Sequence, residues 1–581
     1  MLVYGDAKRR EPTKQAIARL RAMMAGLPSL GPGLDRHADL VACLIEAGEL
    51  AQGVIDAEFH ARGGRDARSA AADAAMRLAT SLAAQVAASW ESAFRDAGEP
   101  ADLDLDALEG LVLPQSIELR QPEGFAFYAL YPESYLEAAR PLAGADWRVL
   151  GLRSIGATLA AAVAVGLRTA RERPPPLTLR PGGHPYDRHL SLADDIAADP
   201  GASYAIVDEG PGRSGSSIAA AARHLEERGV RASAIHLFPG HANGPGPEAS
   251  PAVQALWSRC PVHVTEFDAW ALRGDKPWRR LDGWVADLVG PLTEPLRDLS
   301  CGAWRQLRPD SEAEWPPSHP WAERRKFLAT GRGGRWHVKF AGLGRRGRET
   351  LDRARILAQA GFVPDPVGWR HGFLVERWRE DTESLAGLPR QELIEGVGRY
   401  IGFRARHFPA SPERGASLQT LLDMALCNAV EALGPEAALR FERSRGLDRL
   451  QARCRPVETD SRLHAWEWLW TEDGLLKTDA LDHHAGHDLV GCQDVAWDAV
   501  GAAIEFALSR AEREALFLAI EREAGRRLDE DIVRFLTPCY LAFQLGSYVM
   551  AAAAAADQSE STRLGASVAR YREALRRELG L

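Results

Sequence analysis

An apolar run at residues 204–207 ends in two acids, Asp208 and Glu209, and a loop of small residues follows. The loop reads Gly210, Pro211, Gly212, Arg213, Ser214, Gly215, Ser216 and Ser217. Together with the amphipathic segment at 218–228, this order predicts a strand, a loop and a helix. Backbone N–H groups and the positive end of the helix dipole converge at such a loop, and its glycines let the backbone approach an anion closely. The loop is therefore predicted to bind a phosphate, and the two acids suit sugar hydroxyls or a bound Mg²⁺.

This stretch resembles the phosphoribosyl-pyrophosphate (PRPP) loop of type I phosphoribosyltransferases, in which apolar residues and two acids precede Thr/Ser-Gly-x-Thr/Ser. Asp208 and Glu209 match the acids, and residues 214–217 match the phosphate cradle. The spacer at 210–213 is one residue longer than in the family and places Arg213 beside the cradle. The resemblance implies that PRPP is the substrate and that the acids hold its ribose hydroxyls, directly or through Mg²⁺. It also implies that the cradle holds the 5′-phosphate. An ordinary turn between a strand and a helix is the alternative.

Two further segments extend this resemblance across residues 116–270. A predicted strand at 147–152 runs into a turn and a helix, like the segment that binds pyrophosphate in the family. The turn residues are Arg153, Ser154, Ile155 and Gly156. A strand at 177–180 opens a loop that resembles the lid over PRPP, with Tyr186, Arg188 and His189 placed to exclude water. Because these strands alternate with helices, we expect a parallel sheet with ligands at the carboxyl ends of its strands.

The C-terminal half carries a lysine and an acid in an order that suggests different chemistry. Lys339 lies in a predicted strand at 336–340, Glu349 begins a predicted helix, and another strand follows at 372–378. This order resembles the small lobe of kinases of the aminoglycoside-phosphotransferase type. The resemblance implies that Lys339 holds the α- and β-phosphates of ATP, as a compact ammonium group can, and that Glu349 orients it. A lysine on the solvent face of a strand is the plainer interpretation.

The predicted hairpin at 465–478 leads to Asp479, which resembles the metal-binding Asp of such kinases. Their catalytic loop reads His-x-Asp with an Asn five residues later, and here the match fails. Arg462 takes the place of the catalytic Asp and cannot accept a proton, whereas Glu467 takes the place of the Asn and suits Mg²⁺. This half is therefore either a kinase-like domain that binds a nucleotide or peptide without conventional catalysis, or an α+β domain of another kind.

Potential metal ligands gather just after this hairpin. They are Asp482, His483, His484, His487 and Asp488, with Cys492 nearby. Their spacing matches no known zinc pattern, and adjacent histidines on one helix point apart. A polar loop that gives one or two contacts to a cofactor is the favoured interpretation.

The composition is that of an ordinary globular protein. The chain has 581 residues, 46% hydrophobic and 26% charged, with a net charge of -9 that argues against bulk nucleic-acid binding. Seven scattered cysteines and a charged N-terminus predict a reduced, cytoplasmic location and no signal peptide. The apolar run at 540–556 is interrupted by Gln544 and Ser547, which favours a buried helix over a membrane span. Only six lysines accompany the many arginines, which indicates a GC-rich, bacterial genome.

The expected fold class is multidomain α/β, and the length allows three or four domains. Residues 1–115 form an almost wholly helical N-terminal region, a cap or an element that joins copies of the chain into a homo-oligomer. Residues 116–271 form the phosphoribosyltransferase-like α/β domain with its parallel sheet. Residues 272–320 form a linker rich in Pro, Trp and Arg. Residues 321–581 form a kinase-like α+β domain that is mostly helical after residue 378.

Three functions remain open at this stage. The first is transfer of ribose-5-phosphate from PRPP to an unknown acceptor, with release of pyrophosphate and with Mg²⁺ as cofactor. The second is a regulator that senses PRPP or a nucleotide without catalysis. The third is a small-molecule phosphotransferase that uses ATP through the C-terminal half. In each case the partner is a small sugar phosphate or nucleotide.

Overall fold

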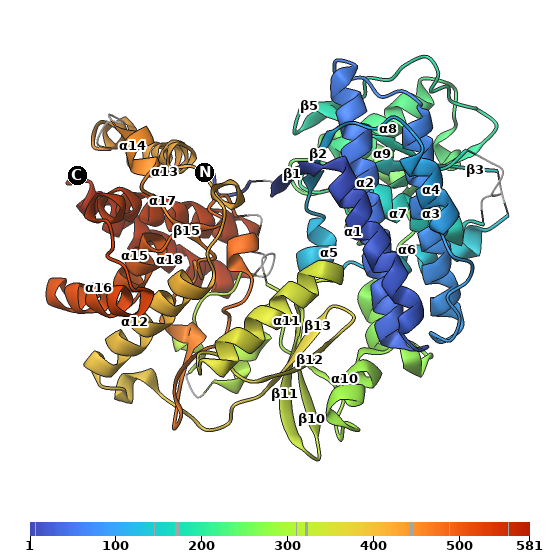
Figure 1. Ribbon diagram of the computed structural model, residues 1–581. Helices are drawn as coiled ribbons and strands as arrows, with labels where there is room; N and C mark the ends of the chain where they lie inside the picture. Colours follow the sequence, from blue (N-terminus) through green and yellow to red (C-terminus); the bar gives the residue numbers. More distant parts are fainter. Residues whose placement is uncertain are drawn as a thin grey trace.

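The computed structural model of the protein describes residues 1–581 except 6, 145, 169–173, 309–310, 320–322, 442–445, 487 and 556. The predicted boundary between residues 320 and 321 thus lies outside the described residues. Figure 1 shows the long N-terminal helices beside a parallel sheet, an antiparallel sheet at one end, and a block of C-terminal helices opposite the N-terminal ones. The chain is therefore a mixed helix and sheet protein built from several parts.

The N-terminal region is mainly helical, as predicted. Its helices are α1 (Thr13–Gly26), α2 (Leu34–Ala61), α3 (Ala70–Glu91) and α4 (Asp102–Glu109). A short strand departs from the expectation, because β1 (Lys8–Pro12) pairs antiparallel with β2 (Ser116–Arg120). The apolar faces of α2 and α3 are buried within the chain, where α2 packs on α3, α7, α11 and β2. The homo-oligomer predicted for these helices stays a prediction.

The predicted parallel sheet is present, with the strand order β4-β3-β7-β8. Its strands are β3 (Trp147–Leu152), β4 (Leu177–Leu179), β7 (Ser203–Val207) and β8 (Ile235–Phe238). The helices of this part are α5 (Glu123–Phe127), α6 (Pro132–Ala139), α7 (Gly156–Gly166), α8 (Ser216–Glu226) and α9 (Pro251–Arg259). Alternate residues face opposite sides: Val149 and Val207 share a core with α7, whereas Leu150 and Ile206 share one with α8. A small hairpin of β5 (Gly182–His184) and β6 (Asp187–His189) stands beside α8.

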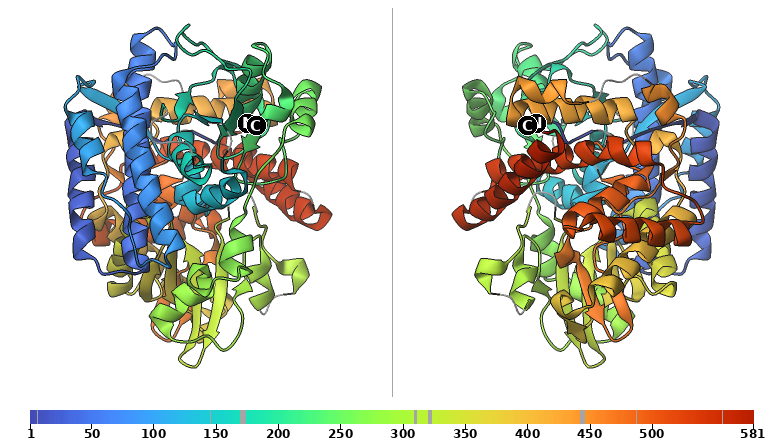
Figure 2. Two further views of the ribbon diagram at one scale, coloured as in Figure 1. Left: turned by 90° about the vertical axis from the view of Figure 1, so that its right-hand side faces the viewer. Right: turned by 90° about the vertical axis from the view of Figure 1, so that its left-hand side faces the viewer.

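The antiparallel sheet has the order β12-β13-β11-β10-β9 and lies at one end of the molecule in both views of Figure 2. Its strands are β9 (Arg297–Asp298), β10 (Lys326–Gly331), β11 (Gly334–Phe340), β12 (Pro366–Arg370) and β13 (Phe373–Arg377). Helix α11 (Gly344–Gln359) packs on β12 and β13. The predicted linker contributes both β9 and α10 (Leu281–Val289), which contacts β12. It is therefore part of the fold rather than a spacer alone.

The rest of the chain is mostly helical, as expected. Its helices are α12 (Arg390–His407), α13 (Leu418–Leu433), α14 (Leu447–Gln451), α15 (Ala496–Glu505), α16 (Arg510–Ala524), α17 (Glu530–Ala554) and α18 (Gln558–Glu578). The predicted hairpin consists of β16 (Trp468–Thr471) and β17 (Gly474–Lys477), and β14 (Thr382–Glu383) extends it. Two short strands that were not predicted, β15 (Pro456–Val457) and β18 (Gln493–Asp494), pair with each other.

The first residues of the chain run across to the C-terminal helices, where the N label stands in Figure 1. Val3 is buried in the core that α13 and α17 share, and its carbonyl accepts a hydrogen bond from the Leu489 amide at 2.9 Å. Helix α17, which holds most of the long apolar run, packs against α13, α15 and α18. Within the described part of the chain, no helix is both long enough and apolar enough to cross a bilayer.

Candidate functional site

The loops singled out in the middle of the sequence meet at the carboxyl edge of the parallel sheet. The turn at 153–155 follows β3, and the loop at 208–215 follows β7. Between β5 and β6, the Pro185 carbonyl accepts hydrogen bonds from the Ser214 hydroxyl at 3.1 Å and the Ser216 hydroxyl at 2.7 Å. The predicted lid thus touches the predicted phosphate cradle. The same contact means that both hydroxyls already have a carbonyl acceptor in this conformation.

Glycines at two positions let the backbone pack closely against neighbouring segments. Gly215 has a φ of +65°, and a Cβ atom there would lie 2.9 Å from side-chain atoms of Pro245 and Val253. A Cβ atom on Gly151 in β3 would lie 2.2 Å from the carbonyl oxygen of Gly156, the first residue of α7. Only glycine lets strand and helix come this close, which places the first-turn amides of α7 at the sheet edge.

The two arginines predicted to bind phosphate are engaged elsewhere. Arg153 is fully buried and donates to Asp56 at 2.9 Å, to Asp66, and to the hydroxyl and carbonyl of Thr178. Arg213 forms an ion pair with Glu248. These contacts hold the loops to α2 and to the segment before α9. The sequence did not reveal this role, because the acids that pair with Arg153 lie about 90 residues earlier.

The two acids after β7 have neither a lysine nor an arginine hydrogen-bonded to them among the described residues. Asp208 accepts a hydrogen bond from the Glu209 amide at 2.8 Å. Burial raises the pKa of Asp208 to about 7. Burial, with repulsion from Glu123 and Asp208, raises the pKa of Glu209 to about 8. Arg180 acts on Asp208 from a distance and only partly offsets its burial. Buried carboxylates with no cation hydrogen-bonded to them favour protonation, or the arrival of a cation such as Mg²⁺.

The remaining predicted residues of this site lie around the same loops. Ser154 and Ile155 form the turn before α7, Gly210 lies beside the His241 ring, and Ser217 is in the first turn of α8. In the hairpin, Tyr186 lies near Arg213, Arg188 donates to the Gly183 carbonyl at 2.7 Å, and the His189 ring packs against Gly183. All of them are therefore near one another, and their assignment to PRPP stays a prediction.

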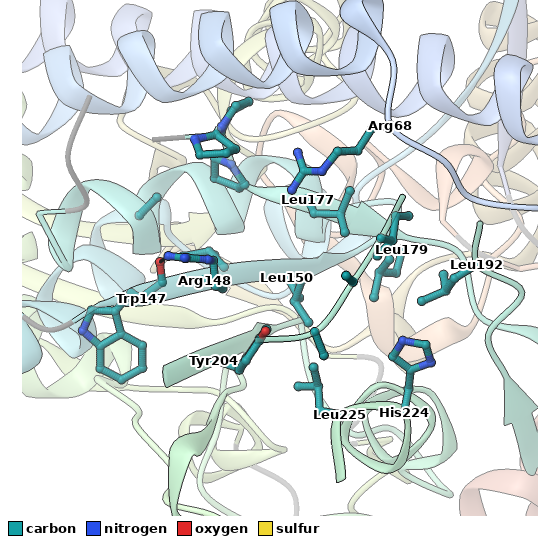
Figure 3. A pocket seen from close by; sticks show the side chains of 18 residues that line it. Arg68, Trp147, Arg148, Leu150, Leu177, Leu179, Leu192, Tyr204, His224 and Leu225 are labelled. Atoms are coloured by element: carbon teal, nitrogen blue, oxygen red, sulfur yellow. Dashed lines mark hydrogen bonds between the residues drawn. The ribbon is translucent and has the colours of Figure 1, made fainter. Parts of the chain in front are cut away.

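A cavity of about 100 Å³ lies elsewhere on this sheet, as Figure 3 shows. Trp147, Leu150, Leu177 and Tyr204 line it from the strands, and Leu225 lines it from α8. The lining runs along the strands from Trp147, the first residue of β3, to Leu179, the last residue of β4. The cavity is smaller than ordinary small-molecule pockets of about 300 Å³ or more, and it contains none of the predicted PRPP-binding residues.

In the C-terminal half, Lys339 and Asp479 form an ion pair although 140 residues separate them. Lys339 comes from the middle of the antiparallel sheet and is 8% exposed, whereas Asp479 follows the hairpin strand β17. Burial alone would lower the pKa of Lys339, but Asp479 and Asp482 outweigh it and raise that pKa to about 12. Lys339 therefore faces acids rather than solvent.

Asp479, Asp482 and His483 bring ligand atoms within 4.8 Å of one another, close enough to hold one metal ion. His483 lies 3.3 Å from Asp479 through Nε2, and Arg324 donates to Asp482 at 3.2 Å. Burial opposes ionisation of Asp479, but Lys339 and His483 outweigh it and hold its pKa well below the usual range. Of the predicted ligand loop, Asp482 and His483 belong to this cluster, His484 is buried, and His487 lies outside the described residues.

A third carboxylate of this site, Asp460, was not predicted. It is fully buried, binds the Tyr400 hydroxyl, and lies 3.3 Å from His483 Nδ1 and 3.6 Å from Lys477 Nζ. Asp498 accepts hydrogen bonds from the backbone amides of Asp460 at 2.7 Å and Ser461 at 2.8 Å, and so fixes this loop. Ser461 has a φ of +64°, a strained conformation that often accompanies function.

Asp460 stands two residues before Arg462 in the chain. The assignment of Arg462 and Glu467 to the catalytic positions of the kinase pattern stays a prediction.

The other predicted residues have different contacts. Glu467 accepts a hydrogen bond from Lys477 at 2.7 Å, so it belongs to the same charged cluster. Glu349 pairs with Arg346 at 3.4 Å and with Arg345, whereas Lys339 pairs with Asp479. The lysine and helix acid that a kinase brings together are thus not paired here.

No protein-family model matches the chain, and no curated protein matches it. Similar solved structures include the choline kinase LicA from Streptococcus pneumoniae, which is 14% identical with a TM-score of 0.29 over 43% of this chain and 89% of that one. A macrolide 2′-phosphotransferase type I is 17% identical, with a TM-score of 0.31 over 49% of this chain and 94% of that one. A spectinomycin phosphotransferase with ADP and spectinomycin is 11% identical, with a TM-score of 0.32 over 49% and 89%. These structural neighbours are kinase-like, but values this low carry no argument about what this chain does.

Proposed function

We propose that the protein is a Mg²⁺-dependent phosphotransferase that binds a nucleoside triphosphate such as ATP in its C-terminal half and acts on a small molecule. The ion pair between Lys339 and Asp479 carries this proposal. It joins a strand of the antiparallel sheet to a cluster of acids that can hold a cation. A lysine for phosphate charge and acids for Mg²⁺, held side by side, are the parts that phosphoryl transfer requires.

The proposed roles follow from the contacts. Lys339 neutralises the phosphates as a point charge, and Asp479 and Asp482 hold Mg²⁺. The ligand would replace the Lys339–Asp479 pair with a lysine–phosphate contact and a carboxylate–metal contact. Asp460 is the carboxylate that accepts the proton of the substrate hydroxyl, and Asp498 positions it through the backbone.

The proposal is tested by measuring the binding of Mg²⁺–ATP by calorimetry and the consumption of ATP. Lys339→Met and Asp479→Asn should each weaken binding by about 10-fold or more, because a charge-assisted contact is lost. Lys326→Met is the matched control. Lys326 lies on the neighbouring strand β10, opposite Lys339 in the backbone register, but its side chain contacts Glu323 and Trp304 rather than the acids of the site. Equal binding by all of these variants would exclude the proposed site.

We propose a second function for the parallel sheet, namely binding of a sugar phosphate such as PRPP. The contact of the Pro185 carbonyl with Ser214 and Ser216 favours it, because a lid and a phosphate cradle that touch can close over a ligand. The acids Asp208 and Glu209, with their raised pKa values, would receive Mg²⁺ or ribose hydroxyls.

Titration with PRPP and Mg²⁺ tests this second function. Asp208→Asn should abolish binding, whereas Asp187→Asn, which changes an exposed hairpin residue, should not. Release of pyrophosphate with an acceptor would make the site a transferase, and binding without release would make it a sensor. No binding of PRPP at millimolar concentration would rule out both.

A further inference from the structure

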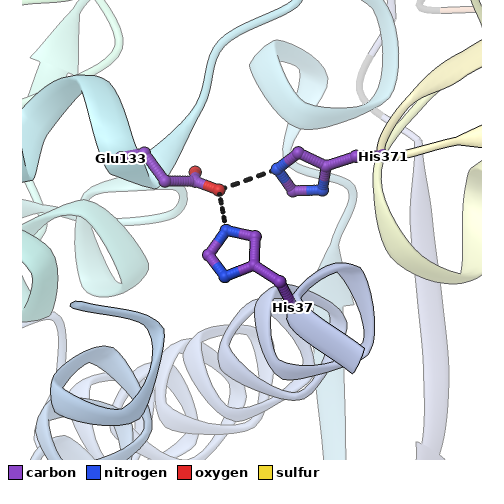
Figure 4. Close-up of side chains that lie close together, drawn as sticks. All are labelled: His37, Glu133 and His371. Carbon is purple, nitrogen blue, oxygen red and sulfur yellow. Dashed lines mark hydrogen bonds and ion pairs between the residues drawn. The ribbon is translucent and has the colours of Figure 1, made fainter. Parts of the chain in front are cut away.

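Three side chains from distant parts of the sequence meet in the protein interior. Figure 4 shows His37 of α2, Glu133 of α6 and His371 of the β12–β13 turn around one carboxylate oxygen. His37 Nε2 lies 2.9 Å from Glu133 Oε1, and His371 Nε2 lies 2.7 Å from the same atom. The three residues offer ligand atoms within 4.8 Å of one another.

The cluster is sealed from solvent. His37 and Glu133 are 0% exposed, and His371 is 1% exposed. The ring of Trp90 stacks on His37 at 5.5 Å, and the rings of Tyr131 and Trp284 each meet His371 edge-on at 5.2 Å. An aromatic surrounding of this kind stabilises charge poorly, so an ionised group inside it needs a partner of opposite charge.

Two polar atoms of the cluster are buried without a partner. Glu133 Oε2 and His371 Nδ1 have no hydrogen-bond partner among the described residues. A divalent cation bound between the imidazoles and Glu133 would give the second carboxylate oxygen a partner.

The contact of His37 with Ser89 suits a metal ligand, and the backbone around His371 is held in place. Ser89 Oγ lies 3.0 Å from His37 Nδ1, the nitrogen that must carry the proton when Nε2 binds a metal. Tyr131 donates a hydrogen bond to the His371 carbonyl at 2.8 Å. His371 has a φ of +40° and precedes Gly372 with a φ of +101°, in a tight turn where Gly, Asn or Asp is the usual first residue. The turn therefore keeps a histidine at some conformational cost.

We propose that His37, Glu133 and His371 form a structural zinc site. Two imidazole nitrogens and both oxygens of Glu133 supply four ligand atoms, the number that closed zinc sites use. Ligand atoms about 2.1 Å from one tetrahedral ion lie roughly 3.4 Å apart. A bound ion would therefore widen the present separations of 2.9 and 2.7 Å between Glu133 Oε1 and the two imidazoles. The ion joins the N-terminal helices, the parallel-sheet part and the antiparallel sheet at one point.

The test is the zinc content of the tag-free protein, purified without chelator and measured by mass spectrometry. We expect about one zinc ion per chain in the unaltered protein and a loss of about tenfold in Glu133→Gln and His371→Gln. His60→Gln is the matched control, because His60 is an exposed histidine on the same helix as His37. It should keep the zinc. Asp482→Asn should also keep it, which separates this site from the cluster at Asp479.

A second measurement does not depend on the folding of variants. The X-ray absorption spectrum of the zinc-loaded, unaltered protein should show two imidazoles and light-atom ligands at about 2.0–2.2 Å. Less than about 0.1 zinc per chain, even after refolding with zinc chloride, would mean a hydrogen-bonded cluster only and would overturn the proposal. Zinc that stays at full occupancy in both ligand variants would overturn it as well.

Discussion

At the scale of single residues, the acids of the two candidate sites differ in what surrounds them. Asp479 and Asp482 face Lys339 and Arg324, and both have lowered pKa values because these cations outweigh burial. Glu209 has no arginine or lysine hydrogen-bonded to it among the described residues and faces Glu123, so burial and repulsion raise its pKa to about 8. The first pair is ready to bind a cation at neutral pH, whereas Glu209 must first lose a proton.

The raised pKa of Glu209 has a consequence for stability. Between about pH 4.5, where the unfolded chain loses this proton, and pH 8, the native state holds the proton more tightly, so stability falls as the pH rises. Glu209→Gln removes this loss. Its free energy of unfolding, measured by thermal unfolding, should exceed that of the unaltered protein more at pH 8.5 than at pH 5. The change should be on the order of 2 kcal/mol after allowance for partial exposure. Glu227→Gln, an exposed neighbour after α8, should show no such pH dependence. A constant difference across the range would contradict the assignment.

Substitutions of Asp460 and Asp479 should have different effects on the kinetics, because only Asp479 is assigned to bind the metal. Asp479→Asn should weaken Mg²⁺–ATP binding and lower turnover together. Asp460→Asn should lower turnover by about 100-fold or more while it leaves the affinity for Mg²⁺–ATP within a few-fold, since it removes only the proton acceptor. Steady-state kinetics and calorimetry on the two variants check this. A loss of nucleotide affinity in Asp460→Asn would move that residue from proton transfer to ligand binding.

At the scale of elements, the phosphate loop depends on glycines with different surroundings. Gly212 and Gly215 both have left-handed backbones, with φ of +58° and +65°. A Cβ atom on Gly212 would meet nothing within 4 Å, whereas one on Gly215 would press on Pro245 and Val253. A side chain at Gly212 would therefore meet backbone strain alone, whereas one at Gly215 would meet both backbone strain and a steric conflict.

Alanine at these two positions should act differently. Gly212→Ala should cost only the backbone term of about 1 kcal/mol. Gly215→Ala adds a steric conflict that shifts the loop and α8, and it should lower stability further and abolish PRPP binding. Thermal unfolding and PRPP titration of both variants check this. Equal effects of the two substitutions would show that packing at Gly215 does not matter.

The sequence predicted those elements whose own residues carry the signal. The apolar run before Asp208 and the amphipathic segment after Ser217 gave β7 and α8 almost at their bounds. By contrast, β1 is Lys-Arg-Arg-Glu-Pro and β12 contains Pro and Gly, so local propensity opposes both strands. They form because β2 and β13 offer edges to pair with, which is information from elsewhere in the chain.

The candidate site residues were likewise predictable only where a local stretch of sequence carries the signal. The loop of Asp208 was found because its residues are contiguous, and Lys339 was found from its place on a strand. Asp460 was not predicted, because its contacts with Tyr400, Lys477 and His483 arise only from the tertiary fold. The cluster of His37, Glu133 and His371 was also missed, because only the tertiary fold brings these residues together.

At the scale of the whole molecule, helix α5 connects the two candidate sites. The Phe127 ring lies 4.2 Å from the guanidinium of Arg324, which binds Asp482. At the other end of α5, a Cβ atom on Gly124 would lie 3.0 Å from Glu209 Oε1. Five helical residues span only about 7 Å. The two sites are therefore neighbours, and a ligand at one can bias the other.

This proximity predicts coupling between the two ligands. Saturation with Mg²⁺ and a non-hydrolysable ATP analogue should change the affinity for PRPP, and PRPP should change the affinity for the analogue by the same factor. Arg324→Gln, which breaks the contact with Asp482, should bring that factor towards one. Calorimetry with each ligand in the presence of the other measures it. A factor of one in the unaltered protein would mean that the sites act independently.

The central claim, a phosphotransferase site at Lys339 and Asp479, is tested most directly by a crystal structure with Mg²⁺ and a non-hydrolysable ATP analogue. The account predicts phosphate oxygens against Lys339 Nζ, and Mg²⁺ bound by Asp479 and Asp482, with the present ion pair between Lys339 and Asp479 replaced. A structure at saturating ligand in which that ion pair is intact and the nucleotide lies elsewhere, or is absent, would contradict it.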